Sequence, residues 1–113
     1  MIIASLTITA PPGQQEQVAG ALRAFLGPTR VEPGCAACAL YQDMEDPGVL
    51  HYVEEWSTQR HLEQHVRSPR YERLLRLMEA SASPPALRFT WISASEGLEY
   101  VKTVRLGDGD GEC

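Results

Sequence analysis

Two histidines and two cysteines have spacings that could support chemistry. His61 and His65 are four residues apart in "STQRHLEQHV", which would place both side chains on one face of a helix. Cys35 and Cys38 form a Cys-x-x-Cys pair earlier in the chain. Two imidazoles and two thiolates are the ligand types of a tetrahedral zinc site, and a single imidazole can serve as a base near neutral pH. A metal site, a base and a partly solvated helix edge are therefore the candidate readings.

The spacing disfavours zinc. The 22 residues between Cys38 and His61 contain an expected hairpin strand, whereas a zinc finger has only a short turn at this point. If Cys38 lies in a strand, its Cα atom is roughly 10 Å from that of Cys35, with the two side chains on opposite faces. We expect neither a metal site nor a disulfide from this pair, and three cysteines without an export signal favour free thiols. Cys113 should be an exposed thiol on the tail.

Aromatic residues flank the histidine pair and could form a pocket. Tyr52, Glu54 and Trp56 alternate, which puts them on one face of a strand, and Tyr71 follows in the next helix. On a helical wheel His65 lies about 60° from Leu62, at the border of the buried stripe, and His61 lies about 100° away toward solvent. His65 could be a base or hydrogen-bond donor in a pocket, or a polar edge residue. Each aromatic side chain is more often simple core.

The hydrophobic pattern predicts the elements that position these residues. Alternating and helical periodicities, with turns at "VEPGC" and "EDPGV", predict strands and helices in the order β-α-β-β-α(α)-β-β. Ser57 or Thr58 would cap the histidine helix, and Ser68 before a proline would begin the next one. The predicted strands are 2–9, 37–44, 50–56, 87–93 and 98–105; the first helix ends at Gly27 and Pro28, and the last carries an apolar stripe of Tyr71, Leu74, Leu75 and Met78.

Composition limits the possible partners. Ten Lys and Arg residues against fifteen Asp and Glu residues give a net charge of -5, without a basic stripe, so nucleic acid is not expected. The first residues lack a basic leader, and no apolar run approaches the ~20 residues of a membrane span. A cytoplasmic protein is expected, with one domain over residues 1–106 and a disordered acidic tail over 107–113.

This element order predicts an α+β fold, a ferredoxin-like antiparallel sheet with helices on one face. The second face of the sheet would then leave apolar side chains in water. We therefore expect a homodimer in which this face is covered by a second copy.

The central segment "VEPGCAACALYQDMEDPGVLHYVEEWSTQRHLEQHVRSPRY" resembles the antibiotic biosynthesis monooxygenase (ABM) domain family. The matching positions are Glu32, Pro33, Gly34, Cys35, Tyr41, Asp43, Pro47, Glu54, Trp56, Leu62, His65, Ser68 and Pro69. The resemblance implies a dimeric α/β barrel, in which two sheets close face to face and each subunit keeps a pocket between its sheet and helices. The haem-degrading branch resembles this chain least, because Ala4, His65 and Leu75 stand at the positions nearest to that branch's functional residues.

The resemblance implies a cofactor-independent monooxygenase that acts on a small aromatic quinol or phenol with molecular oxygen. Such chemistry begins with deprotonation of the substrate, for which His65 is the candidate catalytic base or hydrogen-bond donor. Tyr52, Glu54, Trp56 and Tyr71 are the candidate substrate-binding residues. The alternative is a non-catalytic module of the same fold that binds a small molecule or only dimerises.

Overall fold

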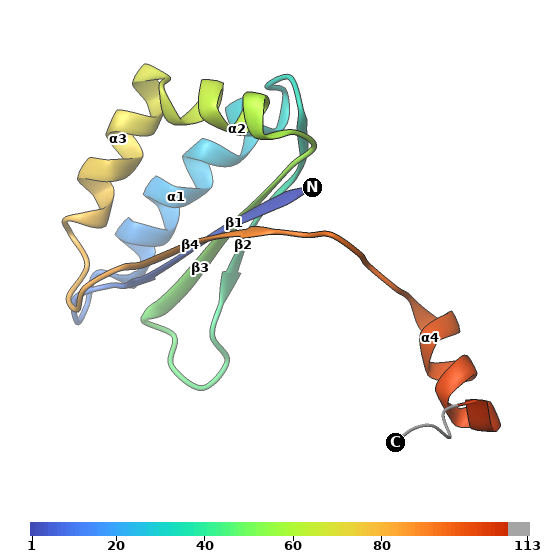
Figure 1. Ribbon diagram of the computed structural model, residues 1–113. Coiled ribbons are helices and arrows are strands. Elements are labelled where there is room, and N and C mark those ends of the chain that lie inside the picture. The colour runs from blue at the N-terminus through green and yellow to red at the C-terminus, as the bar shows by residue number, and fades with distance from the viewer. Residues whose placement is uncertain (109–113) are drawn as a thin grey trace.

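The chain folds into a four-stranded antiparallel sheet with helices on one face (Figure 1). The structure is a computed structural model that describes residues 1–108. The elements in chain order are β1 (Ile2–Thr9), α1 (Gln15–Arg30), β2 (Cys35–Gln42), β3 (Val49–Trp56), α2 (Gln59–Val66), α3 (Pro69–Met78), β4 (Ala86–Trp91), α4 (Leu98–Thr103) and a wide turn, η1 (Val104–Asp108).

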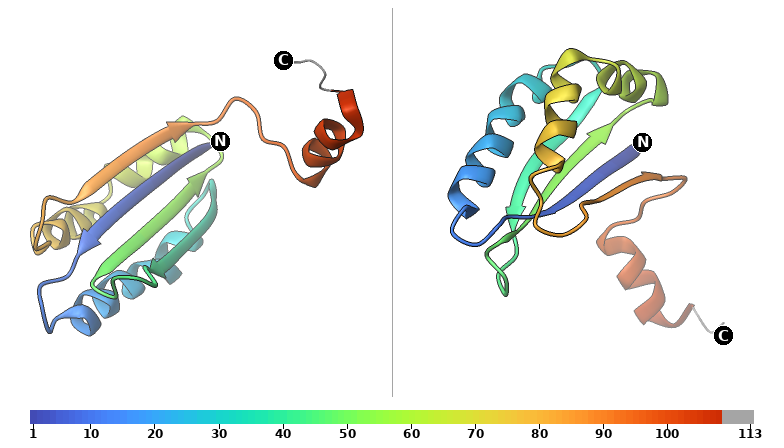
Figure 2. Two further views of the ribbon diagram at one scale, coloured as in Figure 1. Left: turned by 90° about the horizontal axis from the view of Figure 1, so that it is seen from below. Right: turned by 90° about the vertical axis from the view of Figure 1, so that its left-hand side faces the viewer.

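The strand order in the sheet is β2-β3-β1-β4, and every neighbouring pair is antiparallel. Figure 2 shows the strands as one layer, with α1, α2 and α3 as a second layer on the same side. The predicted ferredoxin-like α+β fold is therefore confirmed. The alternation along β1 and β3 is also as predicted, since every second side chain in both strands is buried.

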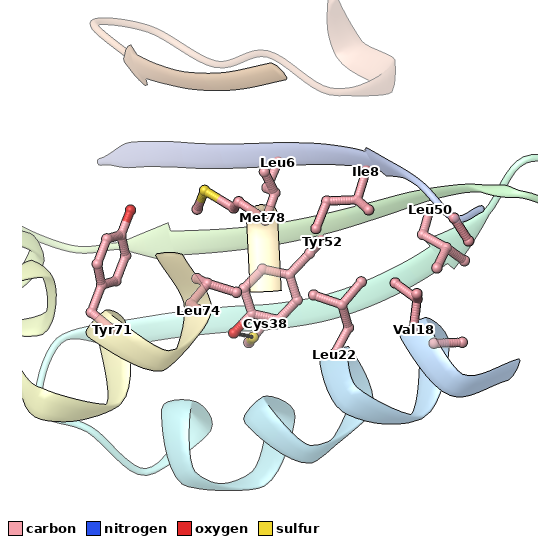
Figure 3. Packing of buried hydrophobic residues seen from close by; sticks show 12 residues of the cluster. Leu6, Ile8, Val18, Leu22, Cys38, Leu50, Tyr52, Tyr71, Leu74 and Met78 are labelled. Carbon is pink, nitrogen blue, oxygen red and sulfur yellow. Dashed lines mark hydrogen bonds between the residues drawn. The ribbon is translucent and has the colours of Figure 1, made fainter. Parts of the chain in front are cut away.

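The core lies between the sheet and the helices. Figure 3 shows side chains of β1 and β3 pointing toward those of α1 and α3. The largest fully buried side chains come mainly from this layer: Trp56, Tyr52, Leu6, Ile8, Leu22, Leu50 and Thr29. In α3 the predicted stripe is buried at Tyr71, Leu74 and Met78, whereas Leu75 is 46% exposed.

Helix α1 was predicted to end at Gly27 and Pro28, but it continues to Arg30. Tertiary contacts explain the extra turn. Thr29 is fully buried and its hydroxyl accepts a hydrogen bond from Tyr52, while Arg30 Nε donates to the carbonyl of Cys38 at 2.9 Å. These contacts override the local signals of glycine and proline.

The break between α2 and α3 has the predicted chemistry. Of the two candidates for the α2 cap, Thr58 accepts a hydrogen bond from the backbone N–H of His61. Ser68 caps α3 in the same way, and Pro69 occupies the first turn. The two caps thus divide this segment into two short amphipathic helices.

The predicted strand 98–105 is wrong, because this segment forms α4 and η1. Its short apolar run fits both periodicities, and the flanking glycines delimit a helix, with Gly107 at φ 93°. In Figures 1 and 2 this arm projects from the end of β4, and all side chains from Ser93 to Gly107 are exposed. Residues 109–113, most of the expected tail with Cys113, lie outside the described residues.

Candidate functional site

His65 is held between two carboxylates. Its Nδ1 lies 3.0 Å from both carboxylate oxygens of Glu32, and its Nε2 lies 3.0 Å from Oε2 of Glu54. The imidazole comes from α2, Glu54 from β3, and Glu32 from the turn between α1 and β2. Three segments that are distant in sequence therefore meet at one side chain that is only 2% exposed.

Aromatic rings complete the surroundings of this imidazole. Its ring centroid lies 4.6 Å from that of Trp56 with an interplanar angle of 33°, and Tyr71 packs edge-on at 5.3 Å. Trp56 also donates its indole N–H to Oε1 of Glu54 at 3.0 Å. Both oxygens of the buried Glu54 carboxylate are therefore hydrogen-bonded, and its orientation is fixed.

The "EPGC" segment is the turn that delivers Glu32. The Cys35 N–H donates to the Glu32 carbonyl at 3.1 Å, with Pro33 and Gly34 at the two central positions. Gly34 has φ +84°, which is the conformation that a type II turn requires at this point. The guanidinium of Arg70, from α3, pairs with Oε2 of Glu32 on the outer side.

The two carboxylates set the charge of the imidazole. Burial by itself lowers the pKa of His65, but hydrogen bonds and charge interactions with Glu54 and Glu32 outweigh burial, so the pKa is raised above the ordinary 6.5. With a carboxylate oxygen 3.0 Å from each ring nitrogen, the geometry suits an imidazolium that donates to both neighbours. This geometry differs from that of a free base, which would keep one ring nitrogen open to a substrate.

A small cavity lies next to this cluster, between the sheet and α3. Its wall is formed by Ala4, Leu6, Tyr52, Glu54, Tyr71, Leu74 and Leu87, and its volume is about 10 Å³. Three of the five predicted site residues, Tyr52, Glu54 and Tyr71, thus share one cavity. Trp56 and His65 lie behind Glu54 and are not part of this wall. The space corresponds to about one water molecule.

Tyr52 and Tyr71 are neutral phenols in this environment. Burial is the largest cause that raises the pKa of Tyr71, to about 12, and the charge of Glu54 adds to it. The same two causes, together with a hydrogen bond from Cys38, raise the pKa of Tyr52. Figure 3 shows the hydroxyl of Tyr52 near Cys38, whose Sγ lies 3.3 Å away. Tyr52 is thus anchored away from Glu54.

The second histidine of the pair has a different neighbour. His61 Nδ1 lies 2.7 Å from the hydroxyl of Thr58, and the His61 ring packs over Gly34, where a Cβ atom would come within 2.3 Å of it. His61 is half-buried, rather than turned fully toward solvent. The two histidines therefore contact the same turn at different points.

Cys35 and Cys38 were predicted to lie on opposite faces of the sheet, but they lie on the same face. An irregularity in β2 between Cys35 and Ala37 places Cys35 opposite Trp56 and Cys38 opposite Glu54, so both thiols face the helices. Both are free thiols. Burial is the main cause that raises the pKa of Cys38 to about 11 and that also raises the pKa of Cys35. Within residues 1–108, no group of three or more His, Cys, Asp or Glu side chains is arranged so that it could hold a metal ion.

A larger groove of about 340 Å³ lies between α2 and β4. It is lined by Gln59, Leu62, Glu63, Val66, Arg67, Phe89 and Trp91. Leu62 packs against Trp56 at the base of this groove, and this contact separates the groove from His65. The groove and the small cavity are thus neighbours along β4.

Sequence reasoning identified Glu32 only through the "EPGC" resemblance and did not identify Arg70. A sequence signal for Arg70 existed. It lies in the first turn of α3, two residues after the cap Ser68, and α3 begins close to the end of α2, which carries His65. The sequence could not show that Glu32 faces His65 across 33 residues.

No helix within residues 1–108 combines the length and the apolar character needed to cross a membrane.

Comparisons with known proteins agree with this architecture. The sequence model of the family "Antibiotic biosynthesis monooxygenase" matches residues 1–77. The structure of PA3566 from Pseudomonas aeruginosa is 31% identical in sequence, covers 82% of this chain and 94% of its own, and has a TM-score of 0.71. A crystal structure of an antibiotic biosynthesis monooxygenase is 25% identical over 83% of this chain and 100% of its own, with a TM-score of 0.72. Among curated proteins, sll1783 of Synechocystis sp. is 24% identical over 98 residues, which are 86% of this chain and 67% of sll1783.

Proposed function

Because this chain belongs to the antibiotic biosynthesis monooxygenase family, we propose that it oxidises a small aromatic quinol or phenol with molecular oxygen and without a bound cofactor. One observation carries the proposal: Glu54 places a carboxylate in the wall of an apolar, aromatic cavity while a buried imidazole holds that carboxylate. Among the side chains of this wall, Glu54 is the acidic one, and the remainder are apolar or phenolic.

The proposed reaction balances without an external reductant. The hydroxyl proton of the substrate passes to the Glu54 carboxylate, and the electron-rich anion then reacts with oxygen. One oxygen atom enters the ring and the other leaves as water, so a quinol becomes a hydroxyquinone and a phenol becomes a quinone. All four electrons come from the substrate. His65 would act as hydrogen-bond donor to Glu54, and its positive charge would stabilise the substrate anion.

Substrate entry requires the cavity to widen, since about 10 Å³ cannot hold a ring whereas cavities of about 150 Å³ bind benzene. The route that we propose passes Leu87, which is 40% exposed on β4 at the edge of the sheet. Outward movement of Leu87 and Leu74 would place a flat ring against Tyr71 and in reach of Glu54. Trp56 would support the site from behind by holding Glu54.

Oxygen uptake with a panel of hydroquinones and phenols tests the enzyme. We expect enzyme-dependent uptake, formation of hydroxyquinone or quinone, and one labelled atom in the product from ¹⁸O₂. His65→Ala and Glu54→Gln should each lower kcat/KM at least about tenfold. His51→Gln is the matched control, because this histidine is partly exposed and pairs loosely with Asp43 at 3.9 Å. Uptake that is unchanged in both site variants would refute the proposed site.

We also propose a homodimer. The arm carries exposed apolar side chains at Leu98, Tyr100, Val101, Val104 and Leu106. Isolated helices shorter than about 12–15 residues are marginal in water, so α4 needs a packing partner. Light scattering after size exclusion should give twice the chain mass of 12.5 kDa. A monomer at micromolar concentration would contradict the dimer.

A second candidate function is favoured by two observations. The cavity beside Glu54 is nearly filled, and both nitrogens of His65 are occupied by carboxylates. These features also suit a non-catalytic module in which the cluster has a structural role and a ligand binds elsewhere. Stabilisation against heat by an aromatic ligand, without oxygen uptake by any compound of the panel, would favour this second function.

A further inference from the structure

We propose that Glu32, anchored by Arg70, is a positioning residue that keeps His65 protonated and thereby fixes the charge next to the cavity. Its role in catalysis rests on the proposed function, whereas its effect on His65 does not. Glu32 does not line the cavity and would act only through the imidazole.

The four charged side chains form a continuous path from the surface to the cavity. Side-chain exposure falls from 27% at Arg70 to 18% at Glu32, 2% at His65 and 3% at Glu54. Each member contacts the next one: Arg70 pairs with Glu32, Glu32 lies 3.0 Å from Nδ1 of His65, and Nε2 of His65 lies 3.0 Å from Glu54. A change at the solvent end can therefore reach the cavity end through a single imidazole.

Charge balance explains why the outer carboxylate matters. Two carboxylates and one guanidinium leave one excess negative charge, which is expensive in a buried site. The excess is balanced when His65 carries its second proton, and its two ring nitrogens then each donate to a carboxylate oxygen at 3.0 Å. Glu32 accepts from Nδ1 through both oxygens, so the other ring proton is directed at Glu54.

The other groups around His65 do not supply this effect. Trp56 and Tyr71 contact its ring from β3 and α3, and both are neutral. The charged and titratable neighbours that bear on it are thus Glu54 from β3, Glu32 from the turn, and Arg70 and Tyr71 from α3. Of the two carboxylates, Glu32 can be altered without changing the wall of the cavity.

The consequence for the proposed reaction is specific. The proton of the substrate passes to Glu54, which becomes a neutral acid, while both ring protons remain on His65. The imidazolium behind Glu54 then balances the charge of the substrate anion in place of the former carboxylate charge. Loss of Glu32 would let His65 become neutral at a lower pH, so that the anion loses its counter-charge.

NMR titration of the imidazole tests this inference without any substrate. In wild-type protein, with the three histidines assigned through His51→Gln and His61→Gln, the resonance of His65 should titrate above the ordinary 6.5. Glu32→Gln should lower that midpoint by at least about one pH unit, a tenfold loss of proton affinity, and Glu32→Asp should restore most of it. The matched control is Asp43→Asn, which removes the carboxylate 3.9 Å from His51 and should leave His65 unchanged.

The pH profile of turnover separates the two proposals. Glu32→Gln should shift the alkaline limb of kcat to lower pH by the same interval, with KM changed less than about twofold, because Glu32 lies outside the cavity wall. If Glu32→Gln leaves the His65 midpoint unchanged in the folded protein, the inference is wrong, whether or not turnover occurs. If wild-type protein oxidises no compound of the panel, the proposed function fails, and the titration alone still decides the role of Glu32.

Discussion

Replacement of His65 by leucine should be among the most destabilising single changes in this domain. Leucine has a similar volume and would fill the space between Trp56 and Tyr71, so the effect of packing is small. What changes is electrostatic. Glu54, with a side chain only 3% exposed, would keep its indole donor but lose His65, its charged partner within residues 1–108.

The expected cost is about 3–5 kcal/mol, which is typical when one member of a buried ion pair is removed. Glu32 contributes less to this cost, because it is 18% exposed and retains Arg70. Domains of this size have unfolding free energies of about 5–15 kcal/mol, so the variant should fold but remain close to its limit of stability. The double variant His65→Leu with Glu54→Gln should recover about 1–3 kcal/mol, since the unpaired charge is then absent.

Urea unfolding followed by far-ultraviolet circular dichroism measures these differences. This signal is preferable to fluorescence, because Trp56 contacts the substituted ring directly. All variants should be compared at one protein concentration, since stability depends on concentration in an oligomer. His51→Leu removes a hydrogen bond to the Thr7 hydroxyl at 3.0 Å and a partly exposed pair, and should cost about 1 kcal/mol, well below the cost of His65→Leu. A cost below about 1 kcal/mol for His65→Leu, or a double variant no more stable than the single one, would refute the electrostatic reasoning.

The same cluster predicts the direction of the pH dependence. Because the folded-state pKa of His65 is raised above 6.5, its stabilising contribution is fully present below about pH 6.5 and is lost as the pH rises through the folded-state value. The unfolding free energy of the wild type should therefore fall across this alkaline window. His65→Leu should lack that slope, and a wild type whose stability rises over the same window would contradict the assignment.

Three further changes test other parts of the structure. Gly34→Ala should cost about 2–4 kcal/mol and lower the thermal midpoint, because φ is +84° and the new Cβ would meet the ring of His61 at 2.3 Å. Cys38, buried and with a pKa of about 11, should react with a disulfide reagent at pH 8 only after unfolding, and fast reaction in the native protein would contradict its placement. Tyr52→Phe should cost about 1 kcal/mol in urea unfolding through lost hydrogen bonds to Thr29 and Cys38, and a neutral result would show that these bonds contribute little.

The fold was largely predictable because its signals are local. Alternation in the strands, and the caps Thr58 and Ser68, are each encoded within a few residues. The errors occurred where distant contacts decide the outcome. The end of α1 depends on hydrogen bonds from Tyr52 and to the Cys38 carbonyl, and the arm after residue 97 has too few residues for periodicity to separate helix from strand.

The site residues stay a prediction, and the structure shows only how they lie. Tyr52, Glu54 and Tyr71 share one cavity wall, whereas Trp56, which strand alternation placed beside Tyr52 and Glu54, is not part of it. Spacing alone could not pair His65 with Glu32, because that contact depends on how a helix lies over a turn on another strand. It also could not show that a carboxylate lies beside each ring nitrogen, which is why the proposed proton acceptor is Glu54 and not His65.

The turn at Gly34 gives a structural reason for the four-residue spacing of the histidines, since both contact this turn. His61, in one turn of α2, packs on Gly34, and His65, in the next turn, lies beside Glu32 of the same bend. A rotation of α2 by one residue, about 100°, would break both contacts together. The two contacts therefore fix the register of α2 on this bend, so the paired histidines align the helix with the sheet.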